Sequence, residues 1–121
     1  MQGVCIANAV GVIPYFSLAS GFLTGKYRSE ADFGKSPRGQ GMKKYLNDRG
    51  FRILAALDKV ARETAATPAR VALAWLMARP GVTAPIVSAT NLLQLEELFA
   101  ATRLILDSSA RAQLDAASMA A

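Results

Sequence analysis

The sequence predicts an α/β fold in which two short strands alternate with helices. Residues 12–16 and 84–87 are short apolar runs with the composition of buried strands. Between and after them, apolar residues recur at helical spacing behind recognisable N-cap residues. The order strand, helix, strand, helix is typical of a parallel α/β unit. Because no internal repeat is present and the polar segment 29–41 does not divide the chain, residues 1–121 are expected to form a single domain.

The first strand is expected to follow the end of a helix. Residues 1–10 have the composition of a helix tail that runs into Gly11. The run Val-Ile-Pro-Tyr-Phe at 12–16 is rich in β-favouring residues and does not alternate cleanly, which fits a strand buried on both faces. Its proline removes one donor from any sheet ladder.

The segment after the first strand has the features of an anion-binding turn. Small residues at 17–21 let main-chain N–H groups approach a ligand closely, and Lys26 and Arg28 supply positive charge. The P-loop of nucleotide-binding proteins is excluded, because Gly21 and Gly25 are one residue too close together and tyrosine follows the lysine where Ser or Thr is required. On these residues alone, an ordinary surface turn is favoured over an anion site.

The polar Gly/Pro segment 29–41 is a long loop, and loops of this length are often functional. A helix is expected from about Asp48, with Asp58 and Arg62 as a favourable i,i+4 pair. Thr67 is a suitable N-cap for the next helix because proline follows it. The apolar residues 71–77 predict that this second helix is largely buried.

The last third of the chain is expected to hold one strand and two helices. The Pro-Gly pair at 80–81 ends the preceding helix, and the strand at 84–87 follows. A helix then spans about 91–102, and Asp107 is expected to cap a final helix. The apolar stripe of the helix at 91–102 consists of Leu92, Leu95 and Phe99.

The composition is that of a soluble globular chain, with 52% hydrophobic and 19% charged residues. No apolar run approaches the roughly 18 residues of a membrane span, and the start lacks a secretory signal, so no membrane partner is expected. The only cysteine, Cys5, cannot form an internal disulfide, which favours the cytoplasm. We expect Cys5 to be a buried, inert thiol, because no histidine is present to activate it.

The net charge of +5 does not indicate a nucleic-acid partner. Between Lys26 and Lys44 the basic residues are interrupted by Glu30 and Asp32, and no RNP-type or zinc-finger pattern occurs. The later arginines fall singly on helical stretches, as on a solvated surface. Neither a nucleic-acid interface nor a metal site is expected.

Two blocks of sequence resemble the aldo-keto reductases. Residues 13–28, IPYFSLASGFLTGKYR, resemble the segment at the end of the seventh barrel strand in bacterial members of this family. Residues 67–90, TPARVALAWLMARPGVTAPIVSAT, and the continuation QLEE at 94–97 resemble the later helix and the last strand. The resemblance implies a partial TIM (β/α)8 barrel, because a whole barrel has eight strands and typically about 250 residues. This chain would be its C-terminal portion, with strands seven and eight, their helices and a C-terminal helix.

The same resemblance implies an oxidoreductase that reduces carbonyl compounds with hydride from NADPH. The family's catalytic Asp, Tyr, Lys and His lie on earlier strands and loops, none of these motifs is present, and the sequence contains no histidine. No catalytic residue is therefore expected in this chain. We expect the isolated chain to be inactive, and a carbonyl substrate to bind only if the missing N-terminal part completes the site.

The resemblance also implies part of a nicotinamide cofactor site. It places Ser17 and Leu18 beside the pyrophosphate and Ser20, Gly21 and Lys26 in the loop that closes over it. It places Arg38 on the long loop, and Ser88, Thr90, Gln94 and Glu97 near the adenosine 2′-phosphate and the adenine. Without the resemblance, helix capping is the favoured interpretation of Ser88 and Thr90.

Three interpretations of function stay open. In the first, the chain is a truncated product or one piece of a split aldo-keto reductase. In the second, it is a non-catalytic binding or assembly module, or a decayed remnant of an aldo-keto reductase. The third is an unrelated small anion-binding domain. A two-strand piece of a barrel has unpaired strand edges, so we expect exposed apolar surface. That surface predicts self-association, pairing with a complementary chain, or marginal stability.

Overall fold

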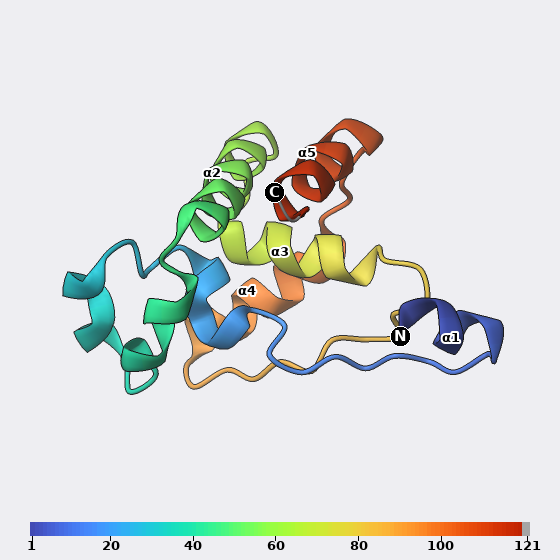
Figure 1. Ribbon diagram of the computed structural model, residues 1–121, viewed down its shortest axis with the longest axis horizontal. Coiled ribbons are helices and arrows are strands. Elements are labelled where there is room, and N and C mark those ends of the chain that lie inside the picture. The colour runs from blue at the N-terminus through green and yellow to red at the C-terminus, as the bar shows by residue number, and fades with distance from the viewer. Residues whose placement is uncertain (120–121) are drawn as a thin grey trace.

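The computed structural model describes residues 1–119, in which a group of helices lies over two extended segments (Figure 1). Figure 1 shows α3 near the centre, with α2 and α5 on one side of it and α4 and the extended segments on the other. The α-helices of this part of the chain are α1 (Gln2–Ala7), α2 (Asp48–Glu63), α3 (Pro68–Met77), α4 (Leu92–Arg103) and α5 (Ser108–Ser118), and the short 3-10 helices are η1 (Ala19–Thr24), η2 (Glu30–Lys35) and η3 (Gly39–Tyr45).

The prediction of regular strands at 12–16 and 84–87 is wrong. Within residues 1–119, the β structure is limited to one parallel bridge between Val12 and Val82. Each segment has a neighbour on one side only, and a lone strand pair is marginal in water. Proline also stands at positions 14 and 85, so each segment lacks one N–H that a ladder would use. The predicted α/β alternation is therefore present as extended chain rather than as a sheet.

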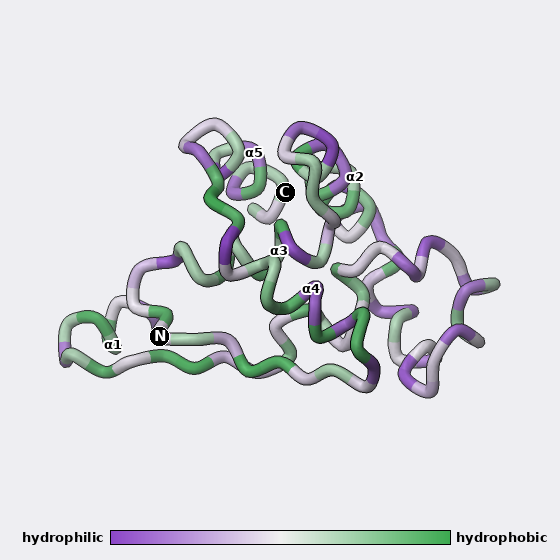
Figure 2. The backbone as a smooth tube through the Cα atoms, turned by 180° about the vertical axis from the view of Figure 1, so that it is seen from behind, coloured by the Kyte–Doolittle hydropathy of each residue, from purple (hydrophilic) through white to green (hydrophobic). Residues whose placement is uncertain are grey.

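The two extended segments nevertheless run parallel and side by side, as Figures 1 and 2 both show. Three main-chain hydrogen bonds join them, from Val12 N–H to the Gly81 carbonyl (3.0 Å), from Thr83 N–H to the Val12 carbonyl (2.8 Å) and from Ile86 N–H to the Pro14 carbonyl (2.8 Å). Because the segments are parallel, their carboxyl ends meet. The turn after Phe16 consequently lies beside the chain that follows Val87.

The predicted helix starts are confirmed by their side-chain caps, each of which stabilises a helix by about 1 kcal/mol. The Thr67 hydroxyl accepts a hydrogen bond from the main-chain N–H of Arg70 (3.3 Å), and proline occupies the first position of α3. Asp107 caps α5 through the N–H of Ala110 (2.7 Å). The caps of α2 and α4 are Asn47 and Asn91.

The core forms where α3 packs against α2 and α4 and where α2 packs against α5. Its buried apolar side chains include Phe22, Tyr27, Leu54, Leu57, Val60, Val71 and Leu114. The prediction that α3 is largely buried holds for residues 71–74, whereas 75–77 are half-buried. Of these, Trp75 lies at the rim of the core, where its indole N–H donates to the Asp115 carboxylate on α5 (2.7 Å).

The polar segment 29–41 contains η2 and the start of η3. Phe33 and Met42 anchor this region because both side chains are buried in the core. The chain passes so close to itself that a Cβ atom at Gly39 would collide with the carbonyl oxygen of Phe33, so glycine is required there. The long loop is thus packed onto the helices.

The predicted pair of Asp58 and Arg62 is wrong among the described residues. The guanidinium of Arg28 donates to both carboxylate oxygens of Asp58, each at 2.9 Å. A bidentate pair of this kind is stronger than a single contact along a helix, which explains why Arg28 is preferred. Arg28 therefore ties the loop to α2, and it is not free to bind an anion.

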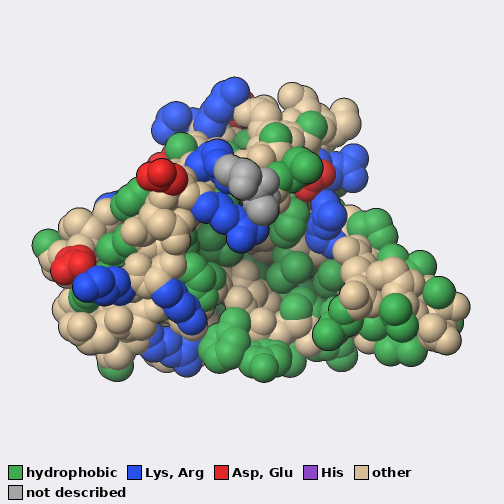
Figure 3. All heavy atoms as spheres, in the orientation of Figure 1, with side chains coloured by type: hydrophobic (Ala, Val, Ile, Leu, Met, Phe, Trp, Pro, Cys, Tyr) green, Lys and Arg blue, Asp and Glu red, His purple; other side chains and the backbone are tan. Residues whose placement is uncertain are grey.

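Large apolar side chains remain exposed along the extended segments. Tyr15 is 70% exposed and Phe16 is 63% exposed, while Ile13 and Ile86 are each more than half exposed. Figure 3 shows apolar side chains gathered along the edge of the molecule formed by α1 and these segments. The predicted apolar stripe of α4 is exposed as well. Cys5 is half-buried rather than buried.

Within residues 1–119, no helix combines the length and the apolar character needed to cross a membrane.

Replacing Leu54 by alanine should destabilise the fold by about 2–5 kcal/mol, because the side chain is buried in α2 and its loss leaves a cavity. The matched control is Leu93→Ala on α4, where leucine is 75% exposed and the change should stay within about 0.5 kcal/mol. Urea unfolding followed by circular dichroism measures both. Equal losses for the two variants would contradict this description of the core.

Candidate functional site

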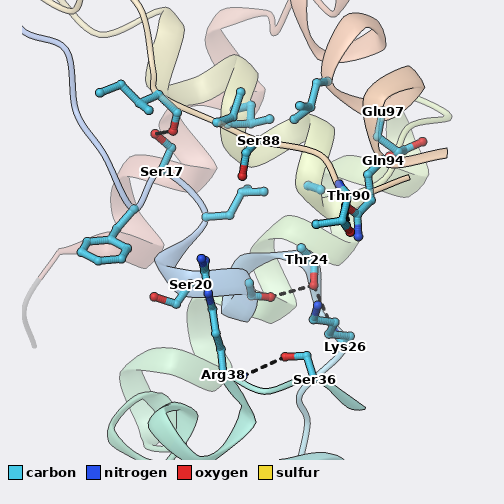
Figure 4. Close-up of a pocket in the computed structure, with 18 of the residues that line it drawn as sticks. Ser17, Ser20, Thr24, Lys26, Ser36, Arg38, Ser88, Thr90, Gln94 and Glu97 are labelled. Carbon is cyan, nitrogen blue, oxygen red and sulfur yellow. Dashed lines mark hydrogen bonds between the residues drawn. The ribbon is translucent and has the colours of Figure 1, made fainter. Parts of the chain in front are cut away.

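A cavity of about 880 Å³ opens between the two extended segments and the helices around them. Its walls come from the turn at 15–26, the loop at 36–38, the start of α3 and the segment 86–98. All ten residues that were predicted for a cofactor site line this cavity: Ser17, Leu18, Ser20, Gly21, Lys26, Arg38, Ser88, Thr90, Gln94 and Glu97. Figure 4 labels all of them except Leu18 and Gly21. The fold therefore brings together residues from three separate stretches of the chain.

Ser17 connects the two extended segments at the mouth of the cavity. Its hydroxyl lies 3.2 Å from the carbonyl oxygen of Pro14 and 3.3 Å from that of Ile86, so its single proton is shared between the two segments. The hydroxyl thus continues the parallel pairing beyond the last main-chain hydrogen bond. Ser17 lines the cavity and also holds its two walls together.

The turn after the first extended segment has a strained main chain. Phe16, Ala19 and Ser20 have φ values of 55°, 50° and 58°, in the left-handed region that residues with a Cβ rarely occupy. Gly21 follows with φ of 104°, and a Cβ there would also press against the Lys26 side chain at 3.3 Å. Such strain costs energy and is typically found at binding and active sites.

One side of the cavity carries positive charge that no carboxylate compensates. Among residues 1–119, neither Lys26 nor Arg38 lies within ion-pair distance of an acidic side chain. Figure 4 shows Arg38 extended from the long loop toward the turn that carries Ser20. Ser36, the hydroxyl partner of Tyr27, stands beside them. The ammonium of Lys26 lies 5.2 Å from the centre of the Tyr27 ring and has no carboxylate partner within residues 1–119. Cations of this kind, with neighbouring hydroxyls and a permissive main chain, are the groups that anion sites use.

The opposite wall is neutral and rich in hydrogen-bonding groups. The side-chain carbonyl of Gln94 accepts hydrogen bonds from the main-chain N–H of Thr90 (2.8 Å) and from its hydroxyl (2.9 Å), which leaves the amide N–H groups of Gln94 available. The cap of α4 is Asn91, so the capping interpretation of Ser88 is wrong. Thr90 supports the helix start through Gln94. Ser88 points into the cavity (Figure 4).

Glu97 is held at the far end of this wall by two donors from α3. The Thr67 hydroxyl donates to one carboxylate oxygen and the Arg70 guanidinium to the other, each at 2.5 Å. Burial alone would raise the pKa of the Glu97 carboxyl, but these hydrogen bonds and the charge of Arg70 outweigh it and lower that pKa below its usual value. Glu97 is therefore ionised and paired.

Sequence reasoning missed several lining residues. Thr24, Ser36 and Thr67 add hydroxyls to the cavity, and Leu98 and Ala69 add apolar surface. Thr67 was recognised only as a helix cap, although its hydroxyl serves both α3 and Glu97. The sequence offers no local signal for the second role, because Glu97 lies 30 residues further along the chain. Arg70 gave no signal, because its partner lies 27 residues along the chain.

The arrangement suits binding of a phosphorylated ligand rather than proton transfer. The charged residues that line the cavity are Lys26, Arg38 and Glu97, and the carboxylate is already paired. The part of the chain that the structure covers holds no group of three or more His, Cys, Asp or Glu that could bind a metal ion.

These features describe a cavity with Lys26 and Arg38 in its walls, at the carboxyl ends of two parallel segments. Comparison with known proteins identifies the family. The chain belongs to the aldo/keto reductase family, whose sequence profile matches residues 1–119. That family has the (β/α)8 barrel fold.

Several curated relatives share the same region. An aldo-keto reductase of Schizosaccharomyces pombe, named for NADP(+), is 33% identical over 106 residues, which cover 83% of this chain and 30% of the relative. L-glyceraldehyde 3-phosphate reductase of Escherichia coli (strain K12) is 31% identical over 115 residues, 89% of this chain and 33% of the enzyme. An uncharacterized oxidoreductase of Mycobacterium tuberculosis is 38% identical over 114 residues, 90% of this chain and 34% of that protein. The chain thus spans about a third of the length of these relatives.

The loop that carries Arg38 should loosen in acid. The pKa of Asp32 is lowered to about 2, first by the Lys35 ammonium and then by the main-chain N–H groups of Arg28 and Ser29. Because this value lies below the roughly 3.9 of an unfolded chain, ionised Asp32 stabilises the loop above about pH 4, and the contribution is lost as the pH falls toward 2.

Amide hydrogen exchange in η2 measures this effect. We expect faster exchange at pH 2.5 than at pH 5, after correction for intrinsic rates, and the same loosening at pH 7 in Asp32→Asn. Glu30→Gln is the control, since this exposed carboxylate only approaches Lys43 at 3.6 Å. Unchanged protection in Asp32→Asn would show that the carboxylate does not hold the loop.

Proposed function

We propose that this chain is the C-terminal portion of an NADPH-dependent aldo-keto reductase of the bacterial type and that residues 1–121 form one domain of it. The chain would supply the seventh and eighth strands of the barrel, their helices and the C-terminal helix. The observation that carries the proposal is the convergence of all ten predicted residues on one cavity, in which Lys26 and Arg38 have no carboxylate partner within residues 1–119. Family membership supports the same assignment.

The residues present fit a nicotinamide dinucleotide. A cavity of about 880 Å³ lies within the range of roughly 300–1,000 Å³ that is typical of ligand pockets. Lys26 and Arg38 would neutralise the pyrophosphate, and the turn at 17–21 would let main-chain N–H groups approach it. Gln94 and Ser88 would bind the adenosine half through their free donors. NADPH, when bound, supplies the hydride that a carbonyl carbon accepts.

The chain's own contribution would be to bind and orient the cofactor. Proton delivery to a carbonyl oxygen requires an acid, and the sequence has no histidine while the one carboxylate in the cavity is paired with Arg70. We therefore propose that the catalytic Asp, Tyr, Lys and His come from a part of the barrel outside this sequence. A carbonyl substrate would bind only when that part is present. The proposed location of the protein is the cytoplasm.

The open edge of the extended segments supports the proposal that the remaining part of the barrel pairs with this chain. Within residues 1–119 no hydrogen bond reaches the main-chain N–H or carbonyl of Ile13 or Tyr15, and the apolar side chains around them are exposed. An unpaired edge of this kind readily accepts another strand. The remaining barrel strands would cover it, and self-association is the competing outcome.

The alternative function is a non-catalytic binding or assembly module, or a decayed remnant of an aldo-keto reductase. The lack of histidine favours it, because the chain by itself has no group in place of that catalytic residue. Turnover on mixing with a chain that carries the other two thirds of the barrel would exclude this alternative.

A fluorescence titration of the 121-residue chain with NADPH tests cofactor binding. Lys26→Ala and Arg38→Ala should each weaken binding by about tenfold, because each removes a cation that no carboxylate compensates. Arg111→Ala on the exposed face of α5 is the charge-matched control and should not change the affinity. Absence of saturable binding up to millimolar NADPH would contradict the proposed function.

A further inference from the structure

Arg70 pairs with an acidic residue of the cavity although it does not itself line the cavity. It lies in the first turn of α3, and its guanidinium donates to Glu97 on α4, which does line the cavity. The two side chains are each 31% exposed, so their interaction is only partly screened by solvent. Arg70 is thus placed between the core and the cavity wall.

Glu97 is the single acidic residue among the residues that line the cavity within the described chain. Left unpaired, its ionised carboxylate would repel the phosphates of a nucleotide. No other cation lies within ion-pair distance of it in residues 1–119, so Arg70 alone neutralises it. Thr67 also donates to Glu97, but a hydroxyl cannot cancel the charge.

The pair is not simply the most stabilising contact available between α3 and α4. The Nε atom of Arg70 is buried and has no hydrogen-bond partner among the described residues. A buried donor without a partner costs stability, so an apolar contact would join the two helices at a lower cost. The pair thus places a charge beside the cavity wall at a cost in stability.

We propose that Arg70 is a specificity-determining residue, which admits the more highly charged dinucleotide by neutralising Glu97. This inference rests on the proposed cofactor site. A 2′-phosphate adds close to two negative charges to the adenosine half, so an unpaired Glu97 would disfavour NADPH more than NADH. Arg70 acts through Glu97 and needs no contact with the ligand.

A double-mutant cycle in the full chain tests the proposal, with NADPH and NADH titrated separately against each variant. Arg70→Gln should weaken NADPH binding by about tenfold and NADH binding by about threefold, and the NADPH loss should shrink at high salt. In the double variant Arg70→Gln/Glu97→Gln, the unpaired charge is gone, and the NADPH:NADH affinity ratio should return to that of the unmodified chain.

Two further variants separate charge from packing. Arg70→Lys keeps the cation and should retain the preference for NADPH. Arg79→Gln is the matched control, because Arg79 lies just after α3 and pairs with Asp115 (2.9 Å) at a site outside the cavity. It should not move the affinity ratio.

The outcomes distinguish this inference from the proposed function. If the unmodified chain binds neither dinucleotide, the proposed function fails and the role of Arg70 fails with it. If it binds NADPH and Arg70→Gln leaves the NADPH:NADH ratio unchanged, only the role of Arg70 is overturned. Equal losses for both dinucleotides in Arg70→Gln, without rescue by Glu97→Gln, would show that Arg70 merely joins α3 to α4.

Discussion

The parallel pairing of residues 12–14 with residues 81–86 determines where the cavity lies. Three main-chain hydrogen bonds and the shared Ser17 hydroxyl join segments that are about seventy residues apart in sequence. Because parallel segments end at the same edge, the turn that follows the first and the helix start that follows the second meet there. Without this pairing, Lys26 and Arg38 would have no opposing wall.

The helices support that pairing from one face and leave the other uncovered. α3 lies between α2 and α4, and its N-cap Thr67 and its residue Ala69 line the cavity, so the element at the centre of the core also forms part of the cavity wall. On the opposite side, the main chain and side chains around Tyr15 are exposed. The fold therefore separates a helical core from an exposed edge, and the cavity lies where the two meet.

The helices could be predicted from sequence, and the long-range features could not. Helix starts depend on local hydrogen bonds, so Thr67 and Asp107 were sufficient to locate α3 and α5. The strand prediction failed because an isolated strand pair is marginal in water, and proline interrupts both of these segments. The ten site residues followed from family resemblance, and their convergence depends on the pairing. The role of Arg70 depends on a contact with Glu97 that no local pattern shows.

Amide hydrogen exchange by NMR in the full chain, with and without saturating NADPH, tests the pairing most directly. The amides of Val12, Thr83 and Ile86 donate across the two segments, whereas those of Ile13 and Tyr15 make no hydrogen bond within residues 1–119. We expect higher protection factors for the first group, with a further increase when NADPH is bound. Equal protection in the two groups, unchanged by NADPH, would show that the segments are not paired and that the cavity between them is not a binding site.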